Sequence, residues 1–564
     1  MKIFRLVAVA TIAIAASACG DLDVVNLNDP DRERAISTPT DVEALISGSF
    51  SSWWSSGHYS TIGIAMSTMA DSHSSSWGNF AMREMSSEPR VAWNNDPSAS
   101  NSSQTRNTWR DAYAALSGVR DGLLAIEGGV EVGAGGADTH RAQTFASLVQ
   151  GLALIRLSNT FDQAFIVDET TSLDDPNALP TMSPYMEVHA AGLAKLDAAI
   201  SMAGQGSFTI PASWVGDDGT WTNTRLAQIA HGFKARAMVS VARTEADRTG
   251  TNWSAVLSEV NAAHTEDFNT VHDDVNWAWD RLKVHAGSND IWARLDLRYL
   301  GPADQSGAYQ AWEGISNPEL RGPFQIDTDD DRITTDAVPN SDGLYVRYVS
   351  AHYFRPERGT YHFSNYSDNR WYPIRLANYV GTNGVFPVKE LDLIKAEALY
   401  RTGDLAGAAA IVNVYREGTG GLPAVTTSGT SGARCTPRTI SGACGDLWEA
   451  LKYEKRMEVW HYGYGVAFFD DRGWGDLLTN TPVHFPVPGA ELDLLLMDIY
   501  TFGGGGEGSA PRLWTDVMDA GTIRWRAEAL EAYGDAMREL HAKYPNDDDA
   551  ASLFAESLMN TMPW

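Results

Sequence analysis

The stretch that decides the fold is GVFPVKELDLIKAEALYRTGDLAGAAAIVNVYRE, residues 384–417. After Pro387, the apolar residues Leu391, Ile394 and Ala398 recur at the spacing of one helix face. This spacing predicts a helix that begins after Pro387 and buries that face against a neighbouring element.

A second helix follows directly. Gly403 is placed to end the first helix, and Asp404 is placed to cap the second. The small and large packing residues of the pair fall at tetratricopeptide spacing: Ala396, Leu399, Gly403, Leu405 and Ala408. No clean repeat of roughly 34 residues continues along the chain, so any solenoid built on this pair is degenerate.

Helical periodicity also marks segments outside this pair: 40–54, 107–126, 140–158, 185–203 and 225–243. In the first of them, Thr40 and Glu43 predict a capping box. From about 270 to 385 the periodicity is lost, and a short alternating run occupies 344–349. We therefore expect a mainly α fold, in which a tetratricopeptide-like scaffold of helical pairs carries an irregular, loop-rich portion with short strands.

These patterns divide the chain into five parts. They are a lipoprotein signal peptide at 1–18, an N-terminal tether at 19–39, a helical part with ligand-facing loops at 40–270, an irregular region at 271–385, and a C-terminal helical part at 386–564 that includes the 387–417 pair. A chain of this length exceeds one ordinary domain, which favours such a division.

The N-terminus, MKIFRLVAVATIAIAASAC, has the pattern of a bacterial lipoprotein signal. Lys2 and Arg5 precede an apolar run, and two small residues lead directly to Cys19, which would carry the lipid, although Ala16 stands where such signals usually carry Leu. The run is shorter than the ~20 residues that a membrane span needs. We expect lipid attachment at Cys19; the alternative is an ordinary secreted protein with a chance cysteine.

Charge and cysteine content limit the partners. The whole chain has a formal net charge of −29, and removal of the signal with its two cations leaves about −31, which argues against a nucleic-acid partner. Cys435 and Cys444 lie in a Gly- and Ser-rich loop of a protein bound for an oxidising compartment, so we expect a disulfide between them. A zinc site is the alternative, but the nearby sequence supplies too few ligands.

No motif argues for catalysis or for a metal. Glu454 and Glu458 share a helix stripe and could form an acid/base couple, but this spacing beside basic residues is more typical of structural pairing. The acidic stretch 327–331 resembles the start of an EF-hand loop, yet Arg332 and Val338 occupy the positions that need Gly and Glu. We expect no catalytic residue, no metal ligand and no cofactor.

Aromatic residues are abundant, with 19 Trp, 20 Tyr and 18 Phe. Trp77 lies among short polar residues, a setting in which a ring can stack on a sugar face while neighbouring polar groups bond its hydroxyls. The ligand-binding candidates are Trp77, Asn79, Trp93, Trp292, Tyr353 and Trp371, and Trp277, Trp279 and Tyr372 occupy comparable loops. For each ring, the alternative role is to anchor its loop by burial.

Four blocks of the sequence resemble the SusD/RagB family of outer-membrane nutrient-binding lipoproteins. The blocks are LDVVNLNDP at 22–30 followed by the capped helix at 40; the helix pair with Pro387, Glu390, Leu393, Ile394, Ala396, Glu397, Ala398 and Asn413; the run with Glu454, Lys455, Arg456, Glu458, Asp470, Trp474 and Gly475; and residues 481–488 with Glu491. The resemblance extends through most of the mature chain. One departure is Tyr462-Gly463-Tyr464-Gly465, where the family usually has Glu-Gly-x-Arg, so part of the family's structural charge network is expected to be absent or replaced.

The resemblance implies a tetratricopeptide-like helical scaffold and a non-catalytic protein. Such a protein is held by its lipid in the outer membrane, faces the cell surface, and delivers a captured oligosaccharide to a TonB-dependent outer-membrane transporter. Ligand residues of the family lie in variable loops, so no site residue is carried over from it. The alternatives are a peptide-capturing receptor of the same family, a helical-repeat scaffold that binds only proteins, and, third, a glycosidase that uses Glu454.

Overall fold

The computed structural model describes residues 36, 38–172, 180–217, 219–273, 275, 277–288, 293–335, 343–349, 364–506, 508, 535–540 and 542–544. The α-helices are α3 (Pro39–Trp54), α4 (Ile62–Met69), α5 (Met82–Met85), α6 (Ser102–Glu127), α7 (Thr139–Thr160), α8 (Tyr185–Ala203), α9 (Ala212–Val215), α10 (Asn223–Ser240), α11 (Glu245–Thr249), α12 (Trp253–Ala262), α13 (Leu297–Leu300), α14 (Ala308–Glu313), α15 (Tyr372–Leu376), α16 (Val388–Thr402), α17 (Leu405–Gly418), α18 (Leu447–Val459), α19 (Val466–Trp474) and α20 (Gly489–Leu494). The described residues also contain two π-helices, η1 (Ser55–Tyr59) and η4 (Lys283–Ser288), and four 3₁₀ turns, η2 (Asn79–Ala81), η3 (Ala134–Gly136), η5 (Gly301–Ala303) and η6 (Pro318–Leu320).

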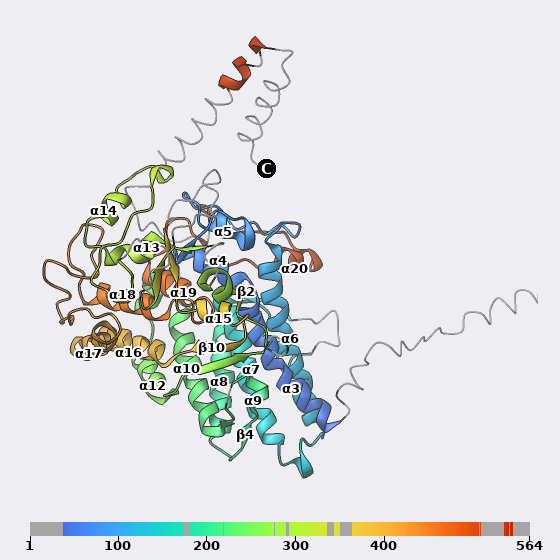
Figure 1. Cartoon of the computed structure of the whole chain (residues 1–564). Helices are drawn as coiled ribbons and strands as arrows, with labels where there is room; N and C mark the ends of the chain where they lie inside the picture. The colour runs from blue at the N-terminus through green and yellow to red at the C-terminus, as the bar shows by residue number, and fades with distance from the viewer. Residues whose placement is uncertain are drawn as a thin grey trace, which may run out of the picture.

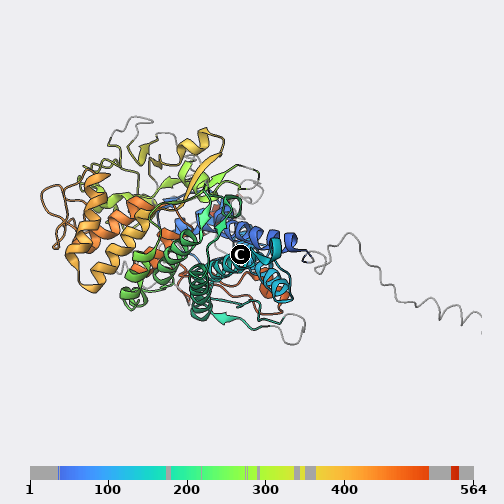
Figure 2. The same ribbon diagram turned by 90° about the horizontal axis from the view of Figure 1, so that it is seen from below.

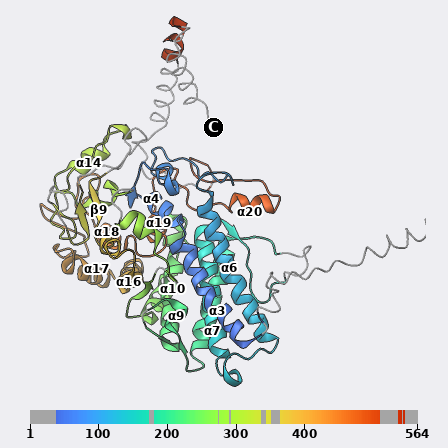
Figure 3. The ribbon, with the colours of Figure 1, turned by 45° about the vertical axis from the view of Figure 1, so that its right-hand side comes forward.

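The longer helices form one continuous row. Helix α3 packs on α6, α6 on α7, α7 on α8, α8 on α10, α10 on α12, α12 on α16 and α16 on α17. The row runs from right to left in Figure 1, and the view from below in Figure 2 gives the same order. Figure 3 shows α3, α6 and α7 lying side by side. The mainly α, tetratricopeptide-like scaffold expected from the sequence is confirmed.

The helix pair of residues 387–417 forms as predicted. Leu391, Ile394 and Ala398 of α16 are buried. Gly403 ends the helix with φ 93°, and the Asp404 side chain caps α17 by accepting a hydrogen bond from the Gly407 amide.

Helix α3 begins earlier than the sequence suggested. Its N-cap is Thr38, whose side chain accepts a hydrogen bond from the Asp41 amide, with Pro39 in the first turn. The capping box expected at Thr40 and Glu43 is therefore wrong. Proline at the first helical position is already fixed in a helical φ and lacks the amide that would need a partner there.

Glycine allows the two most closely packed helices to meet. A Cβ on Gly151 of α7 would lie 2.7 Å from the Leu196 side chain and 3.0 Å from the Gly192 carbonyl oxygen of α8. Gly192 faces Gly151 in the same way, with its Cβ position 3.2 Å from the Gly151 carbonyl oxygen. Alanine at either position would force the helices apart.

The strands among the described residues are short and pair two by two. The pairs are β1 (His73–Ser74) with β7 (Arg294–Leu295), β2 (Gln163–Ala164) with β3 (Ser183–Pro184), β4 (Thr209–Ile210) with β5 (Trp221–Thr222), β6 (Phe268–His272) with β10 (Gly381–Phe386), and β8 (Val346–Tyr348) with β9 (Tyr366–Asp368). All five pairs are antiparallel. The alternating run at 344–349 thus contains a strand, as its pattern predicted.

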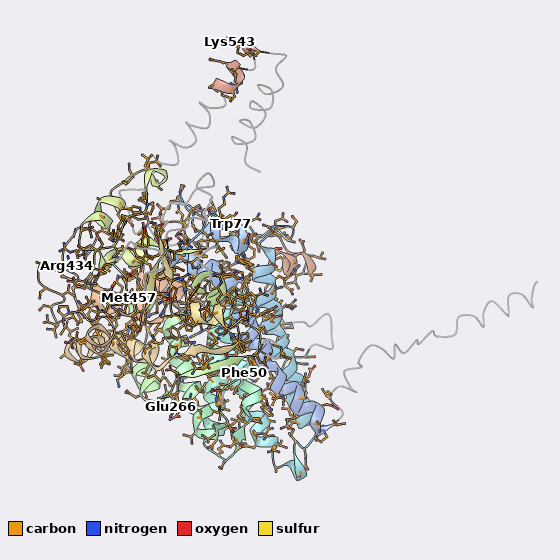
Figure 4. All side chains as sticks on the ribbon, in the orientation of Figure 1. Phe50, Trp77, Glu266, Arg434, Met457 and Lys543 are labelled. Carbon is orange, nitrogen blue, oxygen red and sulfur yellow. A yellow bond between two sulfur atoms is a disulfide. The ribbon has the colours of Figure 1, made fainter. Side chains whose placement is uncertain are left out.

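Between α17 and α18, the chain forms a long loop without helix. Cys435 and Cys444 form a disulfide in this loop, with their Cα atoms 5.6 Å apart, which confirms the pairing expected from the sequence. At the outer edge, Arg434 binds the carboxylates of Asp327 and Asp329. Figure 4 places Arg434 at the left margin of the molecule.

A buried charge network joins this acidic stretch to α18. Arg332 contacts Asp330 at 2.7 Å, Glu454 at 2.7 Å and Glu458 at 3.0 Å, and all four side chains are almost fully buried. Arg416 adds a contact to Glu454 at 3.1 Å. The two glutamates are therefore engaged in structural ion pairs, which leaves neither carboxylate free to act as an acid or base.

The two glutamates of the network have opposite pKa shifts. Burial raises the pKa of Glu454 because desolvation disfavours the charged carboxylate. Arg332 lowers this pKa, but it only partly offsets the burial, and the nearby Asp330 charge raises the pKa further. Burial also opposes ionisation of Glu458, but Lys389 and Arg332, with hydrogen bonds from Thr419 and Tyr345, hold its pKa at about 2.

This depressed pKa predicts a loss of stability in acid. The folded protein keeps Glu458 ionised below the pH at which the unfolded chain protonates it, so its contribution is complete above about pH 4.5 and disappears as the pH falls toward 2. A pKa shift of this size corresponds to about 3 kcal/mol in the free energy of unfolding. We expect Glu458→Gln to flatten this part of the stability curve, measured by urea unfolding at pH 3 and pH 6. The exposed Glu127→Gln should leave the slope unchanged; equal slopes for the wild type and Glu458→Gln would contradict the assignment.

Candidate functional site

A group of half-exposed aromatic rings gathers on the irregular portion of the molecule. We call it the aromatic surface and define it by Tyr59, Trp77, Phe80, Trp279 and Tyr379. The five rings come from three segments that are far apart in sequence: the stretch from the end of η1 to η2, the residues that lead into η4, and the turn after α15. Figure 4 places Trp77 near the top of the molecule, close to α5 in Figure 1.

The turn that carries Trp77 and Phe80 has a strained backbone. Phe80 has φ 57° and ψ 31°, and Ala81 has φ 57°, a left-handed conformation that is unusual for residues other than glycine. Trp77 and Phe80 pack against a small apolar cluster that includes Met82 and Leu282. Because this cluster holds the strained turn in place, the rings of Trp77 and Phe80 stay half-exposed beside η4.

Contacts between rings connect this strained turn to the other two segments of the aromatic surface. Phe80 lies 4.7 Å from His285, measured between ring centroids, and His285 lies 5.7 Å from Trp279. Trp279 stacks on Tyr379 with centroids 5.3 Å apart and an interplanar angle of 26°. Tyr379 has a positive φ of 64°, as does its neighbour Asn378 at 54°, so strain also fixes this turn.

One cation belongs to this surface. The guanidinium carbon of Arg281 lies 4.1 Å from the centroid of the Trp279 ring and 4.5 Å from that of Tyr59. Arg281 is half-buried, and Tyr59 is 41% exposed. The surface therefore offers aromatic faces for stacking and a positive charge beside them.

Buried polar groups support the surface from below. His58 and Asp280 contact each other at 2.8 Å, and Asp280 also accepts a hydrogen bond from the backbone amide of Lys283. The Lys283 ammonium donates to Asn383 and to the Gly384 carbonyl, and burial lowers its pKa to about 8. These contacts hold the two ends of the segment that carries Arg281.

The predicted ligand residues have different positions in the structure. Trp77 and Asn79 lie in the strained turn, with Asn79 exposed, so both remain ligand-binding candidates. Trp93 is 1% exposed and packs edge-on against Phe485 at 4.8 Å, and Trp371 is 7% exposed beneath Lys283. The expectation of accessible rings at these two positions is corrected, because each ring instead anchors its loop by burial. Trp292 and Tyr353 lie outside the described residues.

Sequence reasoning missed most of the aromatic surface. Trp279 was only one of several loop aromatics, and Tyr59, Phe80, Arg281 and Tyr379 were not singled out. Tyr59 follows an apolar helix, so its pattern favours burial. Only the fold brings the three segments together, and no local signal marks them as neighbours.

Apart from the aromatic surface, a charged cavity of about 470 Å³ lies between the disulfide loop, α18 and the end of α19. Its charged groups pair with one another: Lys452 contacts Asp476 at 2.9 Å, and Arg456 contacts Asp471 at 2.9 Å. Burial, reinforced by the neighbouring Asp476 charge, raises the pKa of Asp471 to about 7 although Arg456 opposes the shift. These pairs account for the cavity as a structural feature of α18 and α19.

Two features are absent from the described residues. Within them, no cluster of three or more His, Cys, Asp or Glu side chains is arranged to hold a metal ion. No helix among them is long and apolar enough to cross a lipid bilayer.

Solved structures with the same fold cover most of the chain. A SusD superfamily protein from Bacteroides fragilis matches with a TM-score of 0.51 and 16% sequence identity, over 82% of this chain and 98% of its own. A SusD superfamily protein from Bacteroides vulgatus ATCC 8482 matches with a TM-score of 0.50 and 15% identity, over 83% and 100% of the two chains. A laminarin-binding SusD-like protein matches with a TM-score of 0.50 and 15% identity, over 82% and 99%. No protein-family model and no curated protein sequence matches the chain.

Proposed function

We propose that this chain, which has the SusD-like fold, is a non-catalytic protein that captures an oligosaccharide on its aromatic surface and delivers it to a TonB-dependent outer-membrane transporter. The observation that carries the proposal is the set of half-exposed rings centred on Trp279 and Tyr379. One structural neighbour is a laminarin-binding SusD-like protein. Laminarin binding belongs to the same class of activity, so this neighbour supports the proposal.

The aromatic surface suits a sugar for physical reasons. The C–H faces of a pyranose are apolar and stack on aromatic rings, while its hydroxyls need hydrogen-bond partners. Trp279 and Trp77 supply ring faces, and the exposed Asn79 amide can both donate and accept hydrogen bonds. Strained turns on both sides pre-form the surface, which reduces the entropy lost when a ligand binds.

The proposal also includes the location of the protein in the cell. We infer that Cys19, once acylated, tethers the mature chain to the outer membrane with the helical body facing the cell surface. A tether of this kind keeps the capture protein near its transporter and so raises the effective concentration of one partner near the other. The ligand then passes between two proteins that remain close together.

Replacement of Trp279 tests the binding surface. Trp279→Ala removes a ring that would stack on the sugar, and loss of one such ring is expected to weaken binding about tenfold. The measurement is isothermal titration calorimetry against a panel of neutral and acidic oligosaccharides and peptides.

The chain offers a closely matched control for this variant. Trp448 on α18 is also half-buried and stacks on a tyrosine, Tyr400, with centroids 5.1 Å apart. Trp448→Ala should leave oligosaccharide affinity unchanged. Binding of peptides alone would favour the peptide-receptor alternative, and no binding of either class would favour the protein-interaction scaffold.

A further inference from the structure

Two Trp–Tyr–Arg groups in this molecule have almost the same packing. In the first, Trp279 stacks on Tyr379 at 5.3 Å, and the guanidinium of Arg281 lies 4.1 Å from the Trp279 ring centroid. In the second, Trp448 stacks on Tyr400 at 5.1 Å with an interplanar angle of 28°, and the guanidinium of Arg401 lies 4.4 Å from the Trp448 centroid. The second group therefore serves as an internal reference for the first.

The two groups differ in how the arginine charge is balanced. Arg401 lies 3.8 Å from the carboxylate of Glu397 and donates a hydrogen bond to Thr249 at 3.1 Å. Among the described residues, Arg281 has neither an ion pair nor a hydrogen bond. The Nε atoms of both arginines are buried without an acceptor, so the two groups differ in the carboxylate and the hydroxyl that Arg401 alone contacts. The charge of Arg281 is thus left for a ligand to balance.

The described groups next to Arg281 do not neutralise it either. The adjacent Asp280 is committed to His58 and to the backbone amide of Lys283. Burial, followed by the Arg281 charge, lowers the pKa of His285 to about 3, so this imidazole is neutral at physiological pH. The local charge beside the stacked rings is therefore positive, in a chain whose overall net charge is −29.

We propose that the captured oligosaccharide is anionic, and that its carboxylate or sulfate pairs with Arg281 while a neighbouring sugar ring stacks on Trp279. This inference rests on the proposed function, since it names the class of ligand for the same surface. A guanidinium presents several N–H donors in a planar fork, which matches the oxygens of a carboxylate or a sulfate. Arg281 would then be the residue that separates acidic from neutral glycans.

The test compares three probes on the full-length folded protein: oligogalacturonate, a sulfated galactan oligosaccharide and a neutral laminari-oligosaccharide of equal length. Either acidic probe is expected to bind at least tenfold more tightly than the neutral probe, and the tighter of the two identifies the anionic group. Arg281→Gln should weaken binding of that probe about tenfold and weaken binding of the neutral probe much less. Arg281→Lys, which keeps the charge but loses the fork, should retain part of the affinity.

Arg401→Gln is the matched control, because it removes an arginine from the same packing at the other site. It should change binding of no probe. Neutral and acidic probes that bind equally, or an Arg281→Gln variant that binds acidic probes normally, would overturn the inference. In that case, a Trp279→Ala variant that still loses affinity for the neutral probe would leave the proposed function intact. If no oligosaccharide binds, both ideas fail.

Discussion

Replacing Arg332 by methionine is expected to lower the free energy of unfolding by about 3–5 kcal/mol. The guanidinium holds three carboxylates, those of Asp330, Glu454 and Glu458, each within 3.0 Å. Methionine fills much of the same volume but leaves these buried carboxylates without their common partner. An uncompensated buried charge must be desolvated or protonated, and either alternative costs free energy.

The acidic stretch supplies a control for Arg332. Arg434 also binds two aspartates of residues 327–331, but its side chain is 42% exposed and those of Asp327 and Asp329 are about half exposed. Arg434→Met should change stability by about 0–1 kcal/mol, because water screens an exposed pair. Urea unfolding monitored by tryptophan fluorescence measures both variants. If both variants lower the free energy of unfolding equally, burial does not determine how much these ion pairs stabilise the fold.

The acidic stretch also illustrates how far the sequence determines the structure. Its spacing excluded an EF-hand because Arg332 occupies the glycine position, and the structure gives that arginine its role as the centre of a buried network. The interpretation of Glu454 and Glu458 as structural could be reached from their spacing on α18. Their common partner Arg332, which lies more than a hundred residues away in sequence, could not.

The fold was more predictable than the candidate site because its signals are local. Apolar spacing and turn residues decide where α16 and α17 begin and end, and these signals lie within one short stretch. The aromatic surface depends on three distant segments, so a single ring in a loop says little about its exposure. Trp93 and Trp371 illustrate the limit: both occupy non-periodic stretches, yet tertiary packing buries both.

The departure from the family pattern at residues 462–465 also has a structural explanation. The Tyr464 hydroxyl lies 2.7 Å from the Thr160 hydroxyl, and the guanidinium carbon of Arg156 lies 3.8 Å from the centroid of the Tyr464 ring. Burial lowers the pKa of Arg156 to about 10, and within the described residues this arginine has no carboxylate partner. Among the described residues, the Tyr464 ring rather than a carboxylate therefore faces the buried Arg156 guanidinium.

Replacing Cys19 by serine is expected to release the protein from the membrane. Acyl chains contribute about 0.8 kcal/mol for each buried CH₂ group, and stable anchoring needs more than one such chain. Serine cannot carry the thioether-linked lipid, so the variant would lack the acyl chains that hold the protein at the membrane. Cell fractionation should move the variant from the membrane fraction to the soluble fraction, and protease treatment of intact cells should no longer degrade it at the surface.

The two remaining cysteines provide the control for this anchor. Cys435→Ser combined with Cys444→Ser removes the disulfide, which closes a short loop and stabilises the fold by about 2–3 kcal/mol at most. This double variant should remain in the membrane fraction. A Cys19→Ser protein that stays at the cell surface and still supports oligosaccharide uptake would separate capture from the lipid tether. The opposite outcome is that the released variant loses uptake but keeps its oligosaccharide affinity in solution. This outcome would show that the tether acts by keeping the capture protein close to its transporter.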